Sequence, residues 1–183
     1  MTTTEHRKRA VVVNFFAGPG AGKSTSKAGL FFLMKQRGFK VETVDGYAKE
    51  KTYEGGGLGM NQLYLTAKQD LRLRRLEHQV DFILSDSPLL ISIAYADGIY
   101  GEGDYASLVT RLFDSYQNFN VWVRRTKPYQ AYGRSQTESE ARVLDQRLRA
   151  LAGERIHMEV DGNEHAPGKV LEALTSTHIM ECV

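Results

Sequence analysis

The stretch from Val11 to Thr25, VVVNFFAGPGAGKST, constrains the fold of this chain more than any other part of the sequence. It predicts a buried strand, a glycine-rich turn and the first turn of a helix. The turn, residues 17–24, has the spacing of a phosphate-binding loop, with Ala17 in the place of the first glycine. A polyphosphate needs backbone N–H donors with no side chains in the way, and glycine allows such a backbone because it adopts positive φ without strain.

We expect the loop backbone and the start of the following helix to bind phosphates. Lys23 would reach the β- and γ-phosphate oxygens, and Ser24 would offer its hydroxyl to Mg²⁺. The candidate nucleotide-binding residues are therefore Gly18, Pro19, Gly20, Ala21, Gly22, Lys23, Ser24 and Thr25.

Apolar segments typical of strands alternate with helical patterns along the rest of the chain. We expect strands over 10–16, 40–44, 80–84, 119–123 and 156–160, and helices over 22–36, 60–77, 89–95, 105–116, 137–152 and 169–174. Right-handed crossovers between such elements produce an α/β fold, with a parallel sheet and helices on both faces. Ligands bind at the carboxyl ends of the strands in such sheets.

Two carboxylates lie at those strand ends. Asp86 closes the third strand, the usual place of the carboxylate that holds Mg²⁺ through water, although it could instead cap a helix within the turn 85–88. Asp45 closes the second strand, where it could accept the proton of an acceptor hydroxyl, with an Asx-turn as the alternative. Spacing alone also allows the two roles to be exchanged.

A polar, glycine-flanked segment precedes the helix that ends near residue 152. Within it, the guanidinium of Arg134 could swing over the γ-phosphate, so we assign a lid to about residues 125–138. Arg142 lies two turns further on and could add to the lid, although a surface ion pair is the simpler interpretation. Arg125 and Lys127 lie close to this segment in the sequence.

The segment 46–59 carries three consecutive glycines beside charged residues. This composition is typical of a mobile segment over a site, and equally of a plain flexible connection. On the next helix, Gln62 and Gln69 could read a base edge, although exposed glutamines are common on helices. The end of that helix holds a group that could contact phosphate or simply be solvated, namely Arg72, Arg74 and Arg75.

Apolar positions predict which face of a helix packs on the sheet. For the first helix these positions are Ala28, Leu30, Phe31 and Leu33. In the segment 60–77, Leu63, Ala67 and Leu71 recur in four-residue steps, which indicates a helix. Two helix starts are also indicated. Thr137 and Glu140 form a capping box, and Ser87 with Pro88 suits the cap and first turn of the helix 89–95.

The overall composition narrows the class of protein. A length of 183 residues favours a single domain, 1–183, with a polar tail at 1–9. A net charge of +2 permits a nucleic-acid partner without indicating one. The single cysteine rules out an internal disulfide, and the five histidines lack metal-ligand spacing.

The N-terminus is polar, and no apolar run approaches the ~20 residues that a membrane span requires. We therefore expect a cytoplasmic protein with no membrane partner. The oligomeric state is left open.

Several segments taken together resemble the NadR-like P-loop kinase family. They are AGPGAGKST, VDGYAKE, NQLYLTAKQDLRLRRL, DFILSDSPLL and KPYQAYGRSQTESEAR, and the resemblance extends over about residues 10–175. The family comprises relatives of the nicotinamide riboside kinase domain, many of them encoded by bacteriophages. It implies a P-loop kinase-type, doubly wound sheet of five parallel strands in the order 2-3-1-4-5, with helices on both faces and a lid segment.

The resemblance also implies an activity, the phosphorylation of a nucleoside-like acceptor with ATP and Mg²⁺ as cofactors. Lys23 and Ser24 would act on phosphates and metal, Asp45 near the acceptor, Asp86 on magnesium and Arg134 in the lid. Some phage P-loop kinases act on 5-hydroxymethyluracil in DNA, so the acceptor could be a nucleoside or nucleotide, either free or within modified phage DNA. Asp45 departs from the glutamate that related sequences often carry, which shortens its reach.

A P-loop NTPase that acts as a nucleotide switch with a protein or DNA partner is the alternative function. The segment 46–59 could serve as its switch, but without an evident arginine finger it would hydrolyse slowly. A plain nucleic-acid-binding module is disfavoured, because no stripe of alternating aromatic and basic residues is evident. The sequence therefore favours an ATP-dependent phosphotransferase with an alcohol group as acceptor.

Overall fold

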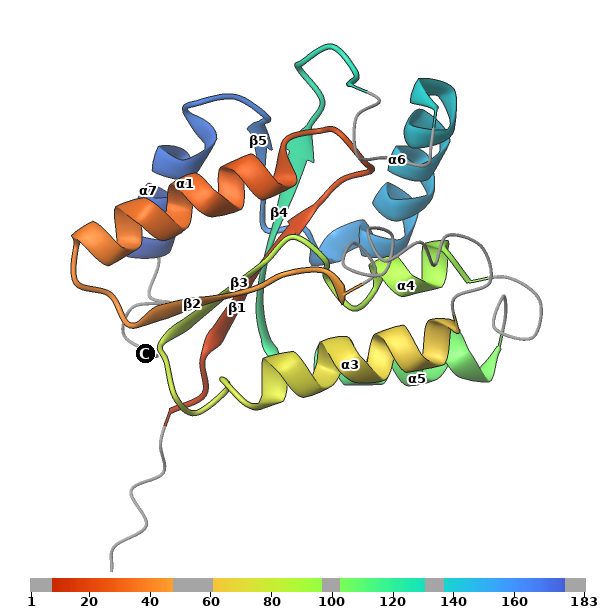
Figure 1. Ribbon diagram of the computed structural model, residues 1–183, viewed down its shortest axis with the longest axis horizontal. Helices are drawn as coiled ribbons and strands as arrows, with labels where there is room; N and C mark the ends of the chain where they lie inside the picture. The colour runs from red at the N-terminus through yellow and green to blue at the C-terminus, as the bar shows by residue number, and fades with distance from the viewer. Residues whose placement is uncertain (1–7, 48–60, 97–102, 131–136, 177–183) are drawn as a thin grey trace, which may run out of the picture.

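The computed structural model describes residues 8–47, 61–96, 103–130 and 137–176 (Figure 1). Its strands are β1 (Val11–Phe16), β2 (Val41–Val44), β3 (Phe82–Ser85), β4 (Gln117–Arg124) and β5 (Met158–Asp161). Its helices are α1 (Lys23–Gln36), α3 (Gln62–Arg74), α4 (Ile91–Ala94), α5 (Asp104–Asp114), α6 (Glu138–Ala152), the 3₁₀ turn η2 (Gly153–Arg155) and α7 (Ala166–Ser176). None of these helices is long and apolar enough to cross a bilayer.

The five strands form one sheet in the order β2-β3-β1-β4-β5, and every pairing is parallel. The predicted fold class and strand order are therefore confirmed. β1 is the central strand, and all six of its residues are buried, as its nearly unbroken apolar sequence predicts. Because the strands are parallel, the loops that follow β1, β2 and β3 all leave the sheet at the same edge.

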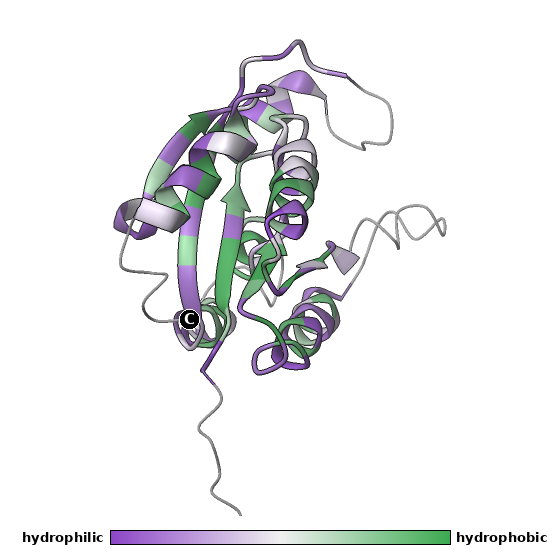
Figure 2. Cartoon of the chain, turned by 90° about the vertical axis from the view of Figure 1, so that its left-hand side faces the viewer, coloured by the Kyte–Doolittle hydropathy of each residue, from purple (hydrophilic) through white to green (hydrophobic). Residues whose placement is uncertain are grey.

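Helices cover both faces of the sheet. α1 and α7 lie together on one face, and α3, α4, α5 and α6 cover the other (Figure 1). Hydropathy follows these layers, with the strands as an apolar band between helices whose outer faces are polar (Figure 2). Alternate residues of β1 enter the two cores: Val13 and Phe15 pack with α1 and α7, whereas Val12 and Phe16 pack with the helices of the other layer.

The predicted inward face of α1 is confirmed except for one residue, whereas the apolar steps along α3 do not mark its buried side. On α1, Leu30 is buried and Phe31 and Leu33 pack partly buried against the core, but Ala28 is exposed; the other buried side chains are Ser26, Lys27 and Met34. On α3, Leu63, Ala67 and Leu71 are exposed, and the buried side chains are Leu65, Thr66, Gln69 and Leu73. Lys27 and Gln69 occupy buried positions because they find ionic or hydrogen-bond partners at the ends of the strands, and the Thr66 hydroxyl bonds to the Tyr105 hydroxyl of α5.

One of the two predicted helix starts is confirmed. At α6, the Thr137 hydroxyl accepts the N–H of Glu140 and the Glu140 carboxylate accepts the N–H of Thr137, which is a complete capping box. α4, in contrast, begins only at Ile91. Ser87 and Pro88 therefore belong to the turn after β3, where the Ser87 N–H donates to the Ser85 hydroxyl at 3.2 Å.

A buried amide cluster fixes the register of the two central strands. The Asn14 side chain, 1% exposed, donates from Nδ2 to Asn118 Oδ1 at 2.8 Å and to Asn120 Oδ1 at 2.9 Å. Asn14 lies opposite Asn120 in the β1–β4 pairing. Each amide in turn donates to backbone, Asn118 to the Phe113 carbonyl and Asn120 to the Arg155 carbonyl. The hydrogen-bonding capacity of Asn14, the one polar residue of β1, is thus met by the neighbouring strand β4.

We expect Asn14→Ala to lower the free energy of unfolding by about 2–3 kcal/mol, because it removes a donor from the buried Asn120 oxygen and the partly buried Asn118 oxygen and opens a small cavity. Urea unfolding followed by circular dichroism measures this change. Gln79→Ala, at an exposed position, serves as the control and should stay within about 0.5 kcal/mol of the parent. Equal midpoints for the two variants would contradict a structural role for the amide cluster.

Candidate functional site

The loop between β1 and α1 has the backbone that anion binding requires. Gly20 and Gly22 adopt φ of 80° and 107°, which glycine alone adopts without strain. The hydrogen bond from the Ser26 N–H to the Gly22 carbonyl, at 2.9 Å, is the first of α1. The N–H groups of the preceding first turn are therefore not used within the helix, and they form a donor cluster at its N-terminus.

The Lys23 ammonium lies across this loop. Its Nζ donates to the carbonyl oxygens of Ala17 at 2.7 Å and Gly18 at 2.9 Å. A positive charge therefore lies beside the backbone donors, which suits a polyphosphate in both charge and geometry. The β5 end closes the other side of the loop, where a Cβ on Gly162 would lie 2.0 Å from the Ala21 carbonyl oxygen.

Asp86 lies directly beside the start of α1. The Ser24 hydroxyl donates to its Oδ2, and the Lys27 ammonium donates to its Oδ1 at 2.9 Å. Burial raises the pKa of Asp86, but the Lys27 charge and the hydrogen bonds from Ser24 and Lys27 outweigh it and hold that pKa below its ordinary value of 3.8. Asp86 is therefore a carboxylate at neutral pH.

Asp45 lies on the outer side of the same cluster. Its carboxylate forms an ion pair with Lys27, and its side chain is 70% exposed. The two strand ends approach closely, because a Cβ on Gly46 would lie 2.1 Å from the Ser87 hydroxyl oxygen. The predicted acids, Asp45 and Asp86, are thus brought together at one edge and joined by one ammonium.

Lys27 is the functional residue that the sequence analysis missed. Its side chain is only 6% exposed, and its Nζ bridges the two carboxylates. The sequence did contain a signal that Lys27 is buried. One face of α1 carries residues at helical spacing, namely Lys23, Lys27, Leu30 and Met34. A lysine on that stripe contradicts the usual expectation that lysines are exposed, unless it has anionic partners.

α3 lies against the Asp45 end of this edge. Gln69 is buried and donates from Nε2 to the Ser87 carbonyl at 3.1 Å, so it is not an exposed glutamine. Arg72 donates to the Asp45 carbonyl at 3.1 Å and lies over the ring of Tyr47 at 4.8 Å.

Tyr64, Lys68 and Arg72 of α3 lie close to Tyr47 of the turn after β2, a grouping not recognised in the sequence. The rings of Tyr47 and Tyr64 meet edge to face with centroids 5.7 Å apart, and their hydroxyls are 3.1 Å apart. Lys68 lies 5.6 Å over the Tyr64 ring. Together with Arg72, these side chains form an aromatic–basic cluster next to Asp45.

Part of the predicted lid falls outside the described residues. Arg134 and most of the segment 46–59 lie in the ranges 131–136 and 48–60, for which no structure is given. Arg142 forms an exposed ion pair with Glu138 on α6 at 2.8 Å, and Lys127 is exposed. Arg125 is buried and pairs with Asp145 of α6 at 2.8 Å.

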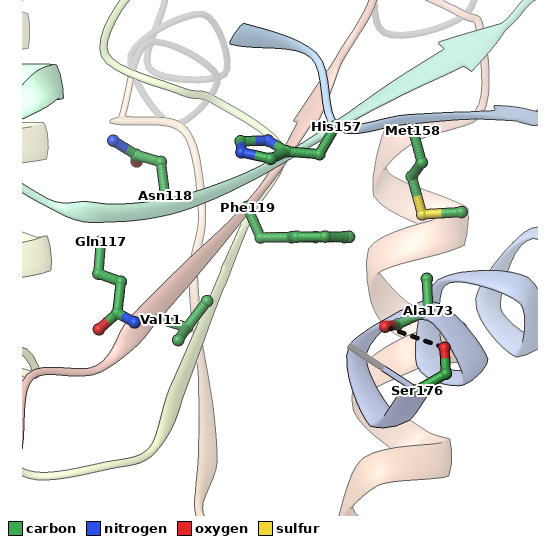
Figure 3. A pocket seen from close by; sticks show the side chains of 8 residues that line it. All are labelled: Val11, Gln117, Asn118, Phe119, His157, Met158, Ala173 and Ser176. Carbon is green, nitrogen blue, oxygen red and sulfur yellow. Dashed lines mark hydrogen bonds between the residues drawn. The ribbon is translucent and has the colours of Figure 1, made fainter. Parts of the chain in front are cut away.

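A hollow of about 590 Å³ lies at the opposite edge of the sheet (Figure 3). Its wall includes residues at or near the amino ends of three strands, Val11, Gln117 and Met158. His157 stacks on Phe119 there, and its Nδ1 accepts the Asn120 N–H at 2.9 Å. Burial lowers the pKa of His157, so the ring is neutral. The described wall holds no carboxylate, and the hollow belongs to the edge away from the phosphate loop.

The residues at the loop fit a magnesium ion that keeps most of its water. The described residues contain no group of three or more histidine, cysteine, aspartate or glutamate side chains suited to a metal. Magnesium bound with a nucleotide needs only one or two protein oxygens besides the phosphates. The Ser24 hydroxyl and the Asp86 carboxylate, already in contact with each other, supply that donor set.

Comparison with known proteins supports the fold. No protein-family model matches the chain, and no curated protein matches it either. A thymidylate kinase from Ehrlichia chaffeensis has a TM-score of 0.57 at 16% identity, covering 91% of this chain and 99% of that one. The APS kinase CysC of Mycobacterium tuberculosis, in complex with AMPPNP and APS, has a TM-score of 0.52 at 13% identity, covering 95% and 99%. The chain therefore has a P-loop kinase-type fold, and the closer resemblance to NadR-like kinases rests on the sequence motifs.

We expect Lys27→Met to lower the free energy of unfolding by about 3 kcal/mol, because it leaves two neighbouring carboxylates without their common cation. Lys35→Met is the matched control. It lies on the same helix and also pairs with a β2 carboxylate, Glu42 at 3.0 Å, but the pair is exposed and should contribute less than about 1 kcal/mol. Urea unfolding compares the two variants, and equal losses would contradict a central role for Lys27.

The lowered pKa of Asp86 predicts a pH dependence of stability. Because the folded protein holds this carboxylate below its unfolded pKa, its contribution is full above about pH 5 and is lost as pH falls through the folded pKa. Asp86→Asn should therefore be less stable than the parent at about pH 6, with the difference shrinking toward about pH 3. Urea midpoints across this range give the measurement, with Glu138→Gln as an exposed control. If the stability difference between Asp86→Asn and the parent stays constant with pH, the pKa of Asp86 is not lowered by folding.

Proposed function

We propose that this chain is an ATP- and Mg²⁺-dependent kinase that transfers the γ-phosphoryl group to a hydroxyl of a nucleoside or nucleotide. The acceptor is either free or a 5-hydroxymethyl pyrimidine within DNA. The proposal combines the sequence resemblance to NadR-like kinases with the arrangement of charged groups along the carboxyl edge of the sheet. This arrangement is the main structural support for the proposed kinase function.

Three functional groups follow the strand order along this edge. The phosphate loop follows β1, Asp86 follows β3 and Asp45 follows β2, and these strands are neighbours in that order. Asp86 therefore lies between the phosphate loop and Asp45. A phosphate donor in the loop, a metal next to Ser24 and Asp86, and an acceptor near Asp45 would lie in the sequence that transfer requires.

The chemistry needs little more than these groups. The acceptor oxygen forms a bond to the γ-phosphorus while the bond from that phosphorus to the β–γ bridging oxygen breaks, and ADP leaves. The hydroxyl proton passes to the Asp45 carboxylate, which is exposed and ionic. Lys23 offsets the negative charge that develops on the phosphoryl oxygens. Bound Mg²⁺ would supply further charge neutralisation across the β- and γ-phosphates.

The cluster beside Asp45 supports a flat, negatively charged acceptor. Tyr47 and Tyr64 offer aromatic surface, and Lys68 and Arg72 offer positive charge close to it. Bases stack on aromatic rings and phosphates pair with such cations. A nucleotide, free or in a strand, has both features, and a free nucleoside has the flat base alone.

We expect Lys23→Ala to abolish transfer of label from γ-labelled ATP while leaving the far-ultraviolet circular dichroism unchanged, because the loop loses its fixed cation. The acceptor panel comprises nucleosides, deoxynucleoside monophosphates, nicotinamide riboside, and duplex DNA with and without 5-hydroxymethyluracil. Lys35→Ala, an exposed lysine on the same helix, should behave as the parent.

Two outcomes would count against this function. A Lys23→Ala variant that transfers phosphate like the parent would remove the loop from the mechanism. ATP turnover that rises with a protein partner or unmodified DNA alone, with no labelled acceptor product, would favour the nucleotide switch instead.

A further inference from the structure

α6 contacts the phosphate loop at its second residue. The Gly18 N–H donates to Asp145 Oδ1 at 2.5 Å. A Cβ at Gly18 would lie 2.7 Å from both this oxygen and the Ala141 carbonyl oxygen, so the loop and the helix are in close contact. Gly18 must be glycine because α6 leaves no room for a side chain.

The other oxygen of Asp145 is held by Arg125, at the end of β4. Arg125 donates to Oδ2 from Nη2 at 2.8 Å and from Nε at 3.1 Å. Its side chain is 8% exposed and that of Asp145 is 21% exposed. Among the described residues, Arg125 Nη1 is buried and has no hydrogen-bond partner. Asp145 is therefore the principal anionic partner of this buried guanidinium, which fixes the direction of the carboxylate.

Gly18 is thereby held from both sides. Its N–H binds Asp145, and its carbonyl accepts the Lys23 ammonium at 2.9 Å. The Gly18 N–H lies in the same planar peptide unit as the Ala17 carbonyl, which also accepts the Lys23 ammonium, at 2.7 Å. If that N–H were unpaired, the peptide unit would be free to turn, and the Ala17 carbonyl would turn with it. The Asp145 carboxylate thus sets the orientation of the group on which the Lys23 ammonium rests.

We propose that Asp145, held by Arg125, is a positioning residue for polyphosphate binding. It fastens the phosphate loop to α6 through the Gly18 N–H and so holds Lys23 in place. This inference rests on the proposed function, because it takes the loop to be a nucleotide site. Neither residue was assigned such a part by the sequence patterns. Asp145 lies mid-helix without a motif, and Arg125 was noted only for its place near the predicted lid.

The test separates the hydrogen bond from the ion pair. Asp145→Asn keeps an oxygen that can accept from Gly18, but its amide N–H₂ then opposes the Arg125 guanidinium. Replacing Arg125 by methionine removes that conflict. The double variant Asp145→Asn with Arg125→Met therefore keeps the link to Gly18, whereas Asp145→Ala with Arg125→Met does not.

Titration with Mg·ATP by calorimetry gives the affinity of each variant. We expect Asp145→Asn alone and the Asp145→Ala double variant to bind about tenfold more weakly than the parent, which is the loss of one charge-assisted hydrogen bond. The Asp145→Asn double variant should recover to within about threefold of the parent. Glu159→Gln is the matched control, because Glu159 pairs with Arg149 of the same helix away from the loop, and it should bind like the parent.

A second readout follows Gly18 itself. With ¹⁵N-glycine labelling, the Gly18 amide proton should resonate downfield in the parent and in the Asp145→Asn double variant, and move upfield in the Asp145→Ala double variant. A structural role alone would change thermal stability without this pattern. Equal Mg·ATP affinity in both double variants, or an unmoved Gly18 resonance, would overturn the inference. A parent that binds no Mg·ATP would instead overturn the proposed function, while the Gly18 resonance would still report whether Asp145 holds the loop.

Discussion

The buried ammonium of Lys27 is the interaction on which this edge of the sheet depends. A charge removed from water is costly unless it is paired, and Lys27 has two anionic partners, on the turns after β2 and β3. Those strands must therefore end where their carboxylates meet α1. The same helix carries the phosphate loop at its N-terminus, so the requirement to pair one lysine also places Asp45 and Asp86 beside the loop.

The framework could be predicted from the sequence because it rests on local patterns. The apolar run of β1, the glycines of the loop and the capping box of α6 each specify a structure within a few residues. Alternation of strands and helices then leaves few arrangements, because parallel crossovers have one hand. The order β2-β3-β1-β4-β5 itself came from the family resemblance, since periodicity does not order strands.

The polar interior could not be predicted in the same way. Lys27 and Gln69 face inward because they have partners on other elements, and apolar periodicity carries no information about such partners. Asp145 lies 127 positions from Gly18, a pairing that only the folded chain reveals. Ser87 and Pro88 resemble a helix start, yet the turn they form supports Asp86 and packs against the end of β2. In each case a long-range contact outweighed the local preference.

The contacts at the edge also bear on which carboxylate has which role, a choice that spacing left open. A metal ligand next to a nucleotide should lie beside the hydroxyl that follows the loop lysine, and Ser24 contacts Asp86 rather than Asp45. A general base should be accessible to an acceptor, and Asp45 is the more exposed of the two, lying one strand further from the loop. Lys27 pairs with both carboxylates and leaves the Asp45 side chain 70% exposed. These contacts favour Asp86 at the metal and Asp45 at the acceptor, because the Ser24 hydroxyl contacts Asp86 and Asp45 is the more exposed of the two carboxylates.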